Sequence, residues 1–135
     1  MALNRTVPAR NDLYQTVQFL RKKIVFGNFG AGAITVGTLP AGATVVYGGV
    51  HVVTAFNSSG TDLIDVGFIG STTDADAYAS ALSMAAVGFI PFDELAAATN
   101  IMQTIDTTVT CTLTQSVADA TAGEAYVIVQ FVKAN

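Results

Sequence analysis

Residues 107–114 read Thr-Thr-Val-Thr-Cys-Thr-Leu-Thr, which is the clearest strand pattern in the chain. On an extended backbone Val109, Cys111 and Leu113 point to one side and the threonines point to the other. Alternation with a period of two, carried by β-branched residues, is typical of a strand with one dry and one wet face. The stretch therefore predicts an antiparallel sheet that buries one of its faces.

Short apolar runs separated by turn signals continue this pattern along the chain. Leu39-Pro40-Ala41-Gly42 combines a proline that fixes φ with a glycine that tolerates positive φ, and so predicts a tight turn. The pair Gly48-Gly49 predicts a bulge, a bend or a hairpin tip within a long β-rich stretch. Further strands are expected at residues 24–26, 33–37, 44–56, 63–69, 87–92, 101–105 and 125–132. The last of them is apolar on both faces apart from Gln130, which predicts a central or covered strand.

Two segments interrupt the β pattern. Thr73 and Asp76 have the spacing of a capping box, and the alanine-rich run up to Ala86 predicts one or two helical turns. Residues 93–98 predict another single turn. About eight short strands with so little helix indicate an all-β fold, an antiparallel β-sandwich or jelly roll.

The composition indicates one domain with more apolar surface than a soluble monomer needs. The chain has 135 residues, one cysteine and a mean hydropathy of +0.51. One cysteine excludes an internal disulfide framework, and no apolar run approaches the roughly 18 residues needed to span a bilayer. Polar residues near the start interrupt any signal-peptide segment, so we expect no membrane association. The extra apolar surface is expected at subunit contacts.

Charge divides the chain into a basic N-terminal arm, residues 1–23, and an acidic body, residues 24–135. The arm carries five of the six basic residues, which are Arg5, Arg10, Arg21, Lys22 and Lys23. Residues 24–132 contain no lysine or arginine but have nine carboxylates. Soluble sheets commonly protect their edge strands with lysine, and this body has none to use. Its edges are therefore expected to be covered or paired with another chain, as in an oligomer.

The conformation of the arm has two interpretations. Asn11 or Asp12 is suited to cap a short helix with Leu13, Val17 and Leu20 on one side. The segment is equally suited to an extended arm that orders on a partner.

The function of the arm has three interpretations: nucleic-acid binding, a solvated terminus, or docking on an acidic protein surface. Five bases without a nucleic-acid motif, next to an acidic body, argue against direct contact with nucleic acid. Many apolar residues argue against a solvated tail, because exposed apolar clusters usually mark contact sites. We therefore predict that the arm docks on a capsid or a neighbouring subunit through Arg5, Arg10, Leu13, Tyr14, Val17, Phe19, Leu20, Arg21, Lys22 and Lys23.

Candidate catalytic groups lack the partners that chemistry requires. His51 is the only histidine and is expected to be a structural or surface residue, and Cys111 is expected to be a buried core thiol. The glycines at 27, 30 and 32 lack the lysine and the following helix of a phosphate loop, so they predict a β-turn. Asp74 and Asp76, even with Asp62 and Asp65 nearby, lack the glycine and distal glutamate of a calcium loop. There is no Gly-x-Ser-x-Gly motif, and we predict no catalytic residue, metal site or cofactor.

Several stretches resemble a known class of viral protein. They are Ala33-Ile34-Thr35-Val36-Gly37-Thr38-Leu39-Pro40-Ala41-Gly42-Ala43, Val52-Val53-Thr54-Ala55-Phe56-Asn57, Thr61-Asp62-Leu63-Ile64-Asp65-Val66-Gly67 and Ala122-Gly123-Glu124-Ala125-Tyr126-Val127-Ile128-Val129. With threonine, alanine and glycine between short apolar strands, residues 33–132 are similar to the capsid decoration, or cement, proteins of tailed bacteriophages.

The resemblance implies a jelly-roll body and a non-enzymatic role on the phage head. It implies a homo-oligomer, commonly a trimer, that binds the major capsid protein and bridges capsomers. The protein would be made in the host cytoplasm and located on the capsid surface of the virion. No catalytic residue is carried over by this resemblance.

Two other functions are compatible with the fold. One is a binding module of a head or tail fibre that recognises a host glycan or receptor, which exposed aromatic side chains around one groove would favour. The other is a jelly-roll enzyme, but metal-holding barrels of that kind typically use several histidines and this chain has one.

Overall fold

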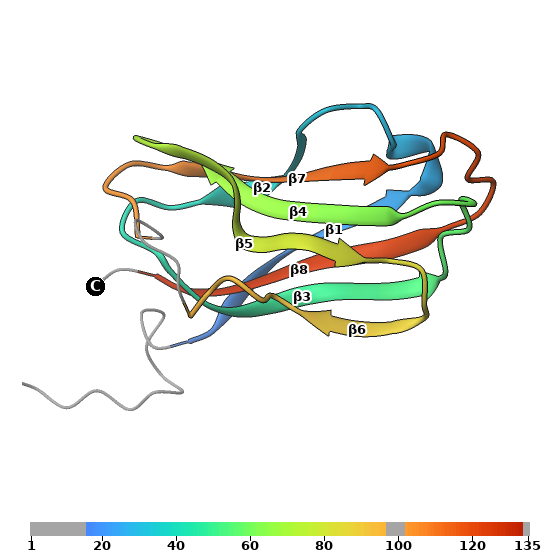
Figure 1. Ribbon diagram of the computed structural model, residues 1–135. Helices are drawn as coiled ribbons and strands as arrows, with labels where there is room; N and C mark the ends of the chain where they lie inside the picture. Colours follow the sequence, from blue (N-terminus) through green and yellow to red (C-terminus); the bar gives the residue numbers. More distant parts are fainter. Residues whose placement is uncertain (1–15, 97–101, 134–135) are drawn as a thin grey trace, which may run out of the picture.

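The computed structural model describes residues 16–96 and 102–133, and these form two packed antiparallel sheets (Figure 1). Sheet A is four-stranded with the order β1-β8-β3-β6, and sheet B is four-stranded with the order β2-β7-β4-β5. The strands are β1 (Gln18–Val25), β2 (Ile34–Leu39), β3 (Thr44–Thr54), β4 (Asp62–Ile69), β5 (Thr73–Ser83), β6 (Gly88–Pro91), β7 (Thr107–Gln115) and β8 (Glu124–Val132), and one 3-10 turn, η2 (Phe26–Asn28), follows β1. The predicted antiparallel sandwich of about eight strands is confirmed.

The core lies between the sheets and follows the alternation seen in the sequence. On β7, Val109 and Cys111 are fully buried and Leu113 is nearly so. The central strand β8 pairs with β1 on one side and β3 on the other, as its two apolar faces predicted. Within the described part of the chain no helix is long and apolar enough to cross a membrane.

Cys111 is a core residue, as predicted. Burial raises the pKa of its thiol to about 12, and Lys22 opposes this shift only in part. The thiol is therefore uncharged at neutral pH and is not an activated nucleophile.

The predicted helix around residues 73–86 is wrong, because residues 73–83 form β5. This strand pairs with β4, and its burial of Tyr78 and Leu82 outweighs the weak helix preference of the alanines. The supposed capping box is not one: the Asp76 amide donates to Asp74 Oδ1 at 3.3 Å. Tertiary pairing thus decides the structure of this segment.

β5 is an irregular strand. Its register against β4 shifts on either side of Val66, and Ala81 has a φ of 53°, a left-handed conformation rare for a residue with a side chain. Two carboxylates hold this bulge in place. Asp93 Oδ1 accepts from the Ser80 amide at 3.0 Å, and Asp65 Oδ1 accepts from the Ala81 amide at 2.7 Å.

Three further expectations concern two turns and one strand. The predicted turn at residues 39–42 is confirmed: Gly42 has a φ of 78°, and the Ala43 amide donates to the Pro40 carbonyl at 3.0 Å. The predicted strand at 101–105 is wrong for residues 102–105, which have no strand conformation, and residue 101 lies outside the described residues. The predicted turn at 93–98 is present at residues 95–96, and residues 97 and 98 lie outside the description.

Gly48 and Gly49 do not break β3, which continues through both of them. They instead leave room for two phenylalanine rings, since a Cβ on Gly48 would meet Phe92 and a Cβ on Gly49 would meet Phe89. Phe92 lies on the buried side of sheet A and Phe89 on its outer side. The register shift of β3 comes earlier, between Val45 and Tyr47.

The boundary expected between residues 23 and 24 falls inside β1. This strand runs from Gln18 to Val25 and pairs along its whole length with β8. Leu20 therefore belongs to a strand and not to a helix, and it packs over Gly37 of β2. Residues 18–23, the C-terminal end of the basic segment, are therefore part of the sandwich.

Candidate docking surface

The structure describes six of the ten residues assigned to the docking arm. Val17 lies just before β1, and the other five, Phe19, Leu20, Arg21, Lys22 and Lys23, lie in β1. Arg5, Arg10, Leu13 and Tyr14 lie outside the described residues. The basic segment thus supplies lysine and arginine to the edge of sheet A, which the sequence of the body alone did not lead us to expect.

The two faces of β1 have different surroundings. Leu20 and Lys22 are opposite Val129 and Val127, which point into the core, whereas Arg21 is opposite Ile128, which is only partly buried. Phe19, Arg21 and Lys23 therefore point away from the sandwich. Lys22 is on the inward side but remains exposed, because β1 is at the edge of the sheet.

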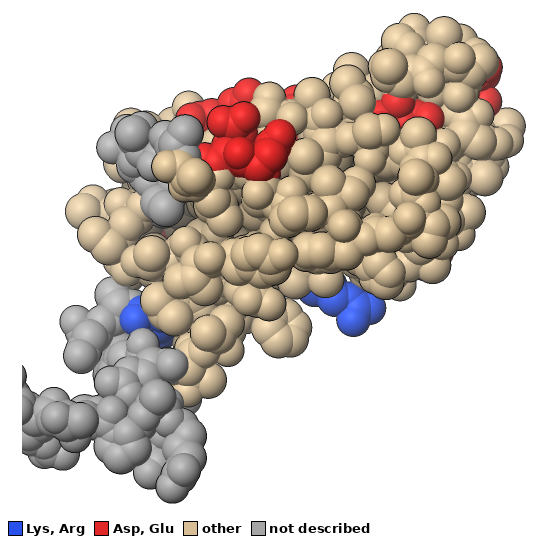
Figure 2. All heavy atoms as spheres, turned by 60° about the horizontal axis from the view of Figure 1, so that its bottom comes forward, with Lys and Arg blue, Asp and Glu red and all other residues tan. Residues whose placement is uncertain are grey.

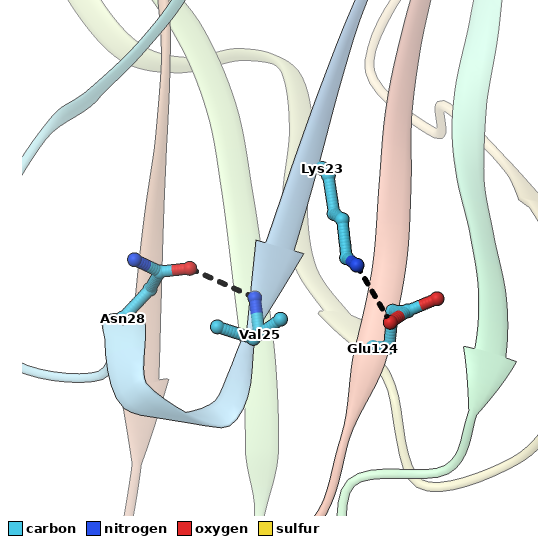
Figure 3. A network of polar contacts seen from close by, with 4 residues as sticks. All are labelled: Lys23, Val25, Asn28 and Glu124. Carbon is cyan, nitrogen blue, oxygen red and sulfur yellow. Dashed lines mark hydrogen bonds and ion pairs between the residues drawn. The ribbon is translucent and has the colours of Figure 1, made fainter.

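Two polar contacts fix the outward side chains of β1. The Arg21 guanidinium carbon lies 4.3 Å from the centroid of the Tyr126 ring, a cation–π contact. Lys23 Nζ lies 3.0 Å from Glu124 Oε1 (Figure 3), and this hydrogen-bonded ion pair raises the pKa of Lys23. At the end of the strand the Val25 amide donates to Asn28 Oδ1 at 2.8 Å, which connects β1 to the η2 turn. Of the three bases, Arg21 and Lys22 keep charge that no carboxylate of residues 16–96 and 102–133 offsets by an ion pair.

Aromatic side chains continue this surface across the outer face of sheet A. Phe19 is 64% exposed, Tyr47 is 46% exposed and Phe89 is 45% exposed. The rings of Tyr47 and Phe89 lie 6.1 Å apart. We call the outward side chains of sheet A the outer patch; its main members are Phe19, Arg21, Tyr47, His51, Val53, Phe89, Tyr126 and Ile128. A contiguous patch of exposed apolar side chains marks a contact site more often than a single exposed apolar residue does.

A shallow depression of about 200 Å³ lies in the outer patch. Arg21, His51, Val53, Tyr126 and Ile128 line it. His51 is exposed there, opposite Tyr126 on one side and Phe89 on the other, as expected of a surface histidine. The other residues that line the depression are a cation, a tyrosine and two aliphatic residues, so no carboxylate among them orients the imidazole.

Several carboxylates gather on another side of the molecule. Figure 2 shows them along the side away from the lysines and arginines visible in that view. Asp74 and Asp76 are exposed on β5, and Asp93 follows β6. We call Asp74, Asp76 and Asp93 the acidic edge. Neither a capping box nor a calcium loop accounts for it, and it was not expected from the sequence as a cluster.

Metal-ligand groups and a second hollow complete the survey of the described residues. Among them, no group of three or more histidine, cysteine or acidic side chains is placed to hold a metal ion. The larger hollow, about 530 Å³, is lined by Phe29, Gly30, Gly32, Thr112, Leu113, Thr114, Gln115 and Ala118, none of which titrates near neutral pH.

Similar folds occur in the capsids of three bacteriophages. Over 98% of this chain and 92% of the matched chain, the structure superimposes on a chain from the capsid of Ralstonia phage GP4 with a TM-score of 0.71 and 20% identity. For the capsid asymmetric unit of cyanophage Pam1 the TM-score is 0.65 at 22% identity, covering 98% and 100% of the two chains. For the acid-stable capsid of Helicobacter pylori bacteriophage KHP30 it is 0.66 at 18% identity, covering 88% and 89%.

No family model matches the chain, and no curated protein matches it significantly. The likeness is therefore one of fold. It extends over nearly the whole of each matched chain, so those chains consist of little more than this one sandwich.

Proposed function

We propose that this chain is a non-enzymatic structural protein of a phage head, a decoration or cement protein that self-associates and stabilises the shell. The observation that carries the proposal is the near end-to-end likeness of its fold to chains of three phage capsids, at TM-scores of 0.65 to 0.71. A chain that consists of one such sandwich is suited to be added to a shell as a separate unit. Its partners would be the major capsid protein and further copies of itself, with a trimer as the favoured assembly.

The outer patch is the part of the described surface best suited to bind the shell. It combines exposed rings with the cation Arg21, and aromatic and arginine side chains are the ones that most often dominate the affinity of protein interfaces. The arm, with Arg5, Arg10, Leu13 and Tyr14 ahead of β1, would extend this contact. The protein would be made in the host cytoplasm and would end on the outer surface of the head.

Replacing two apolar members of the outer patch tests this assignment. Phe19 and Val53 are exposed, so the variant F19S/V53S is expected to fold as the parent does. If both side chains are buried against the shell, their loss should cost about 1–2 kcal/mol or more, which weakens binding about tenfold. Co-sedimentation with undecorated shells of the phage that encodes the chain measures the affinity.

A matched control keeps the test specific. Ile69 and Val117 are about as exposed as Val53 but belong to β4 and to the loop after β7. I69S/V117S should bind shells as the parent does. Equal binding by F19S/V53S and the parent would remove the outer patch from the proposal.

The fibre-module alternative is less well supported. The exposed rings of Phe19, Tyr47 and Phe89 are the feature that would favour it, but they do not line the depression. Tyr126 does line it, and the Arg21 guanidinium covers one face of its ring. We therefore favour protein contact over glycan contact at this surface.

A further inference from the structure

The sandwich has two narrow sides, formed by the edge strands of its sheets. On one side β1 lies next to β2, since Leu20 packs over Gly37. On the other side β6 leads to a segment packed against β5: Tyr78 stacks on Phe92 at 6.1 Å, and the Glu94 amide donates to the Tyr78 carbonyl at 3.1 Å. Because β1 and β6 are the two ends of sheet A, these sides face away from each other.

The β1 side is basic. Arg21 and Lys22 are exposed on it, and Lys23, the third base, is partly neutralised by Glu124. Among the described strands, none pairs with the outer edge of β1, and its free backbone groups are flanked by Arg21 on the outer face of sheet A and by Lys22 on the inner face. An edge strand with adjacent positive charges repels an identical strand, which disfavours symmetric pairing of β1 with β1 of another copy.

The β5 side carries the acidic edge. Asp76 Oδ2 accepts from the Ser80 hydroxyl at 3.3 Å, and Asp93 Oδ1 accepts from the Ser80 amide at 3.0 Å. These donors are neutral, so they hold the carboxylates close together without cancelling their charge. The edge therefore presents negative charge to solvent, and a cationic surface that covers it would be complementary.

We propose that the basic β1 side of one copy docks on the acidic edge of the next copy. Arg21 and Lys22 supply the positive charge, and Asp74, Asp76 and Asp93 supply the negative charge. Each chain carries both halves of the contact, so the two occur in equal number. A contact between two different surfaces of one chain is heterologous; repeated around an axis it closes into a ring, and without closure it continues as a row.

This inference deepens the proposed function and rests on one part of it, the self-association of the chain. It is tested without shells, so it can fail while shell binding stands. Sedimentation velocity should find the parent chain associated in dilute buffer and largely dissociated near 0.5 M salt, because screening weakens contacts between exposed charges. R21E/K22E and D74K/D76K should each raise the dissociation constant about tenfold or more.

The charge-conserving variants K22R and D74E/D76E are the matched controls. Each keeps the charge of its surface and should associate nearly as the parent does. The combined variant R21E/K22E/D74K/D76K exchanges the two charges and should regain association. Circular dichroism would first establish that each variant is folded. The proposal is overturned by a parent chain that stays monomeric in dilute buffer, by association that the reversals leave unchanged, or by a folded combined variant that stays monomeric.

Discussion

Deletion of residues 1–23 is expected to prevent the remaining chain from folding into a stable, soluble sandwich. It removes residues 18–23, six of the eight residues of β1, and with them most of the pairing along one edge of β8. Leu20 is lost from its place over Gly37, and the apolar strand β8 becomes an unprotected edge. Small domains have only about 5–15 kcal/mol of stability in total, so the loss of an edge strand is expected to use up most of it.

Deletion of residues 1–15 is the matched control, because it leaves every described strand intact. Thermal unfolding followed by circular dichroism should give a cooperative transition for the 1–15 deletion at nearly the temperature of the full chain. The 1–23 deletion should show a broad transition or aggregate. If it unfolds cooperatively at the temperature of the full chain, β1 is an appendage and the sandwich folds without it.

Substitution of Gly67 by alanine is expected to destabilise the protein by about 3 kcal/mol or more. Gly67 is buried on β4, at the place where the irregular strand β5 comes closest. A Cβ there would collide with the carbonyl oxygen of Asp74 and with the backbone of Ala75. Backbone cannot rotate aside as a side chain can, so β4 and β5 would have to separate locally.

Gly27 provides the control for this substitution. It lies in η2 with no atom within 4 Å of the position a Cβ would occupy. Gly27→Ala should therefore change stability by no more than about 0.5 kcal/mol. Urea unfolding of the two variants measures the difference, and a Gly67→Ala protein as stable as Gly27→Ala would mean that β5 does not approach β4 as closely as described.

Regular alternation made much of the fold predictable. In β7 the residues Val109, Cys111 and Leu113, and in β4 the residues Ile64, Val66 and Phe68, point to the core as a period of two requires. Pro91 has no N–H to donate to a strand on either side, and β6, which it ends, is an edge strand. In these places local pattern and tertiary environment agree.

The failures come from residues whose conformation is set by distant partners. The sequence of residues 73–83 has no regular strand pattern. The bulge of this strand is held by Asp65 of β4 and by Asp93 in the segment after β6, which are distant in sequence. Residues 18–23 of β1 were not predicted as a strand, because Lys22 and Lys23 interrupt its apolar pattern. The pairing of these two segments with distant strands cannot be read from their own residues.

The candidate surface was predictable only in part. Phe19 and Arg21 were named from the sequence, whereas Tyr47 and Phe89 were not. Strict alternation from the buried Val45 would point Tyr47 into the core, but the register shift between these residues turns its side chain outward. The acidic edge was missed because Asp74, Asp76 and Asp93 come together only when β5 and the end of β6 are adjacent.

A structural component of a phage head must be present in the assembled particle. Quantitative mass spectrometry of particles purified from the phage that encodes the chain tests this directly. We expect many copies per particle, in a fixed ratio to the major capsid protein across preparations. Purified particles that lack the chain, while the infected cells contain it, would contradict the proposal.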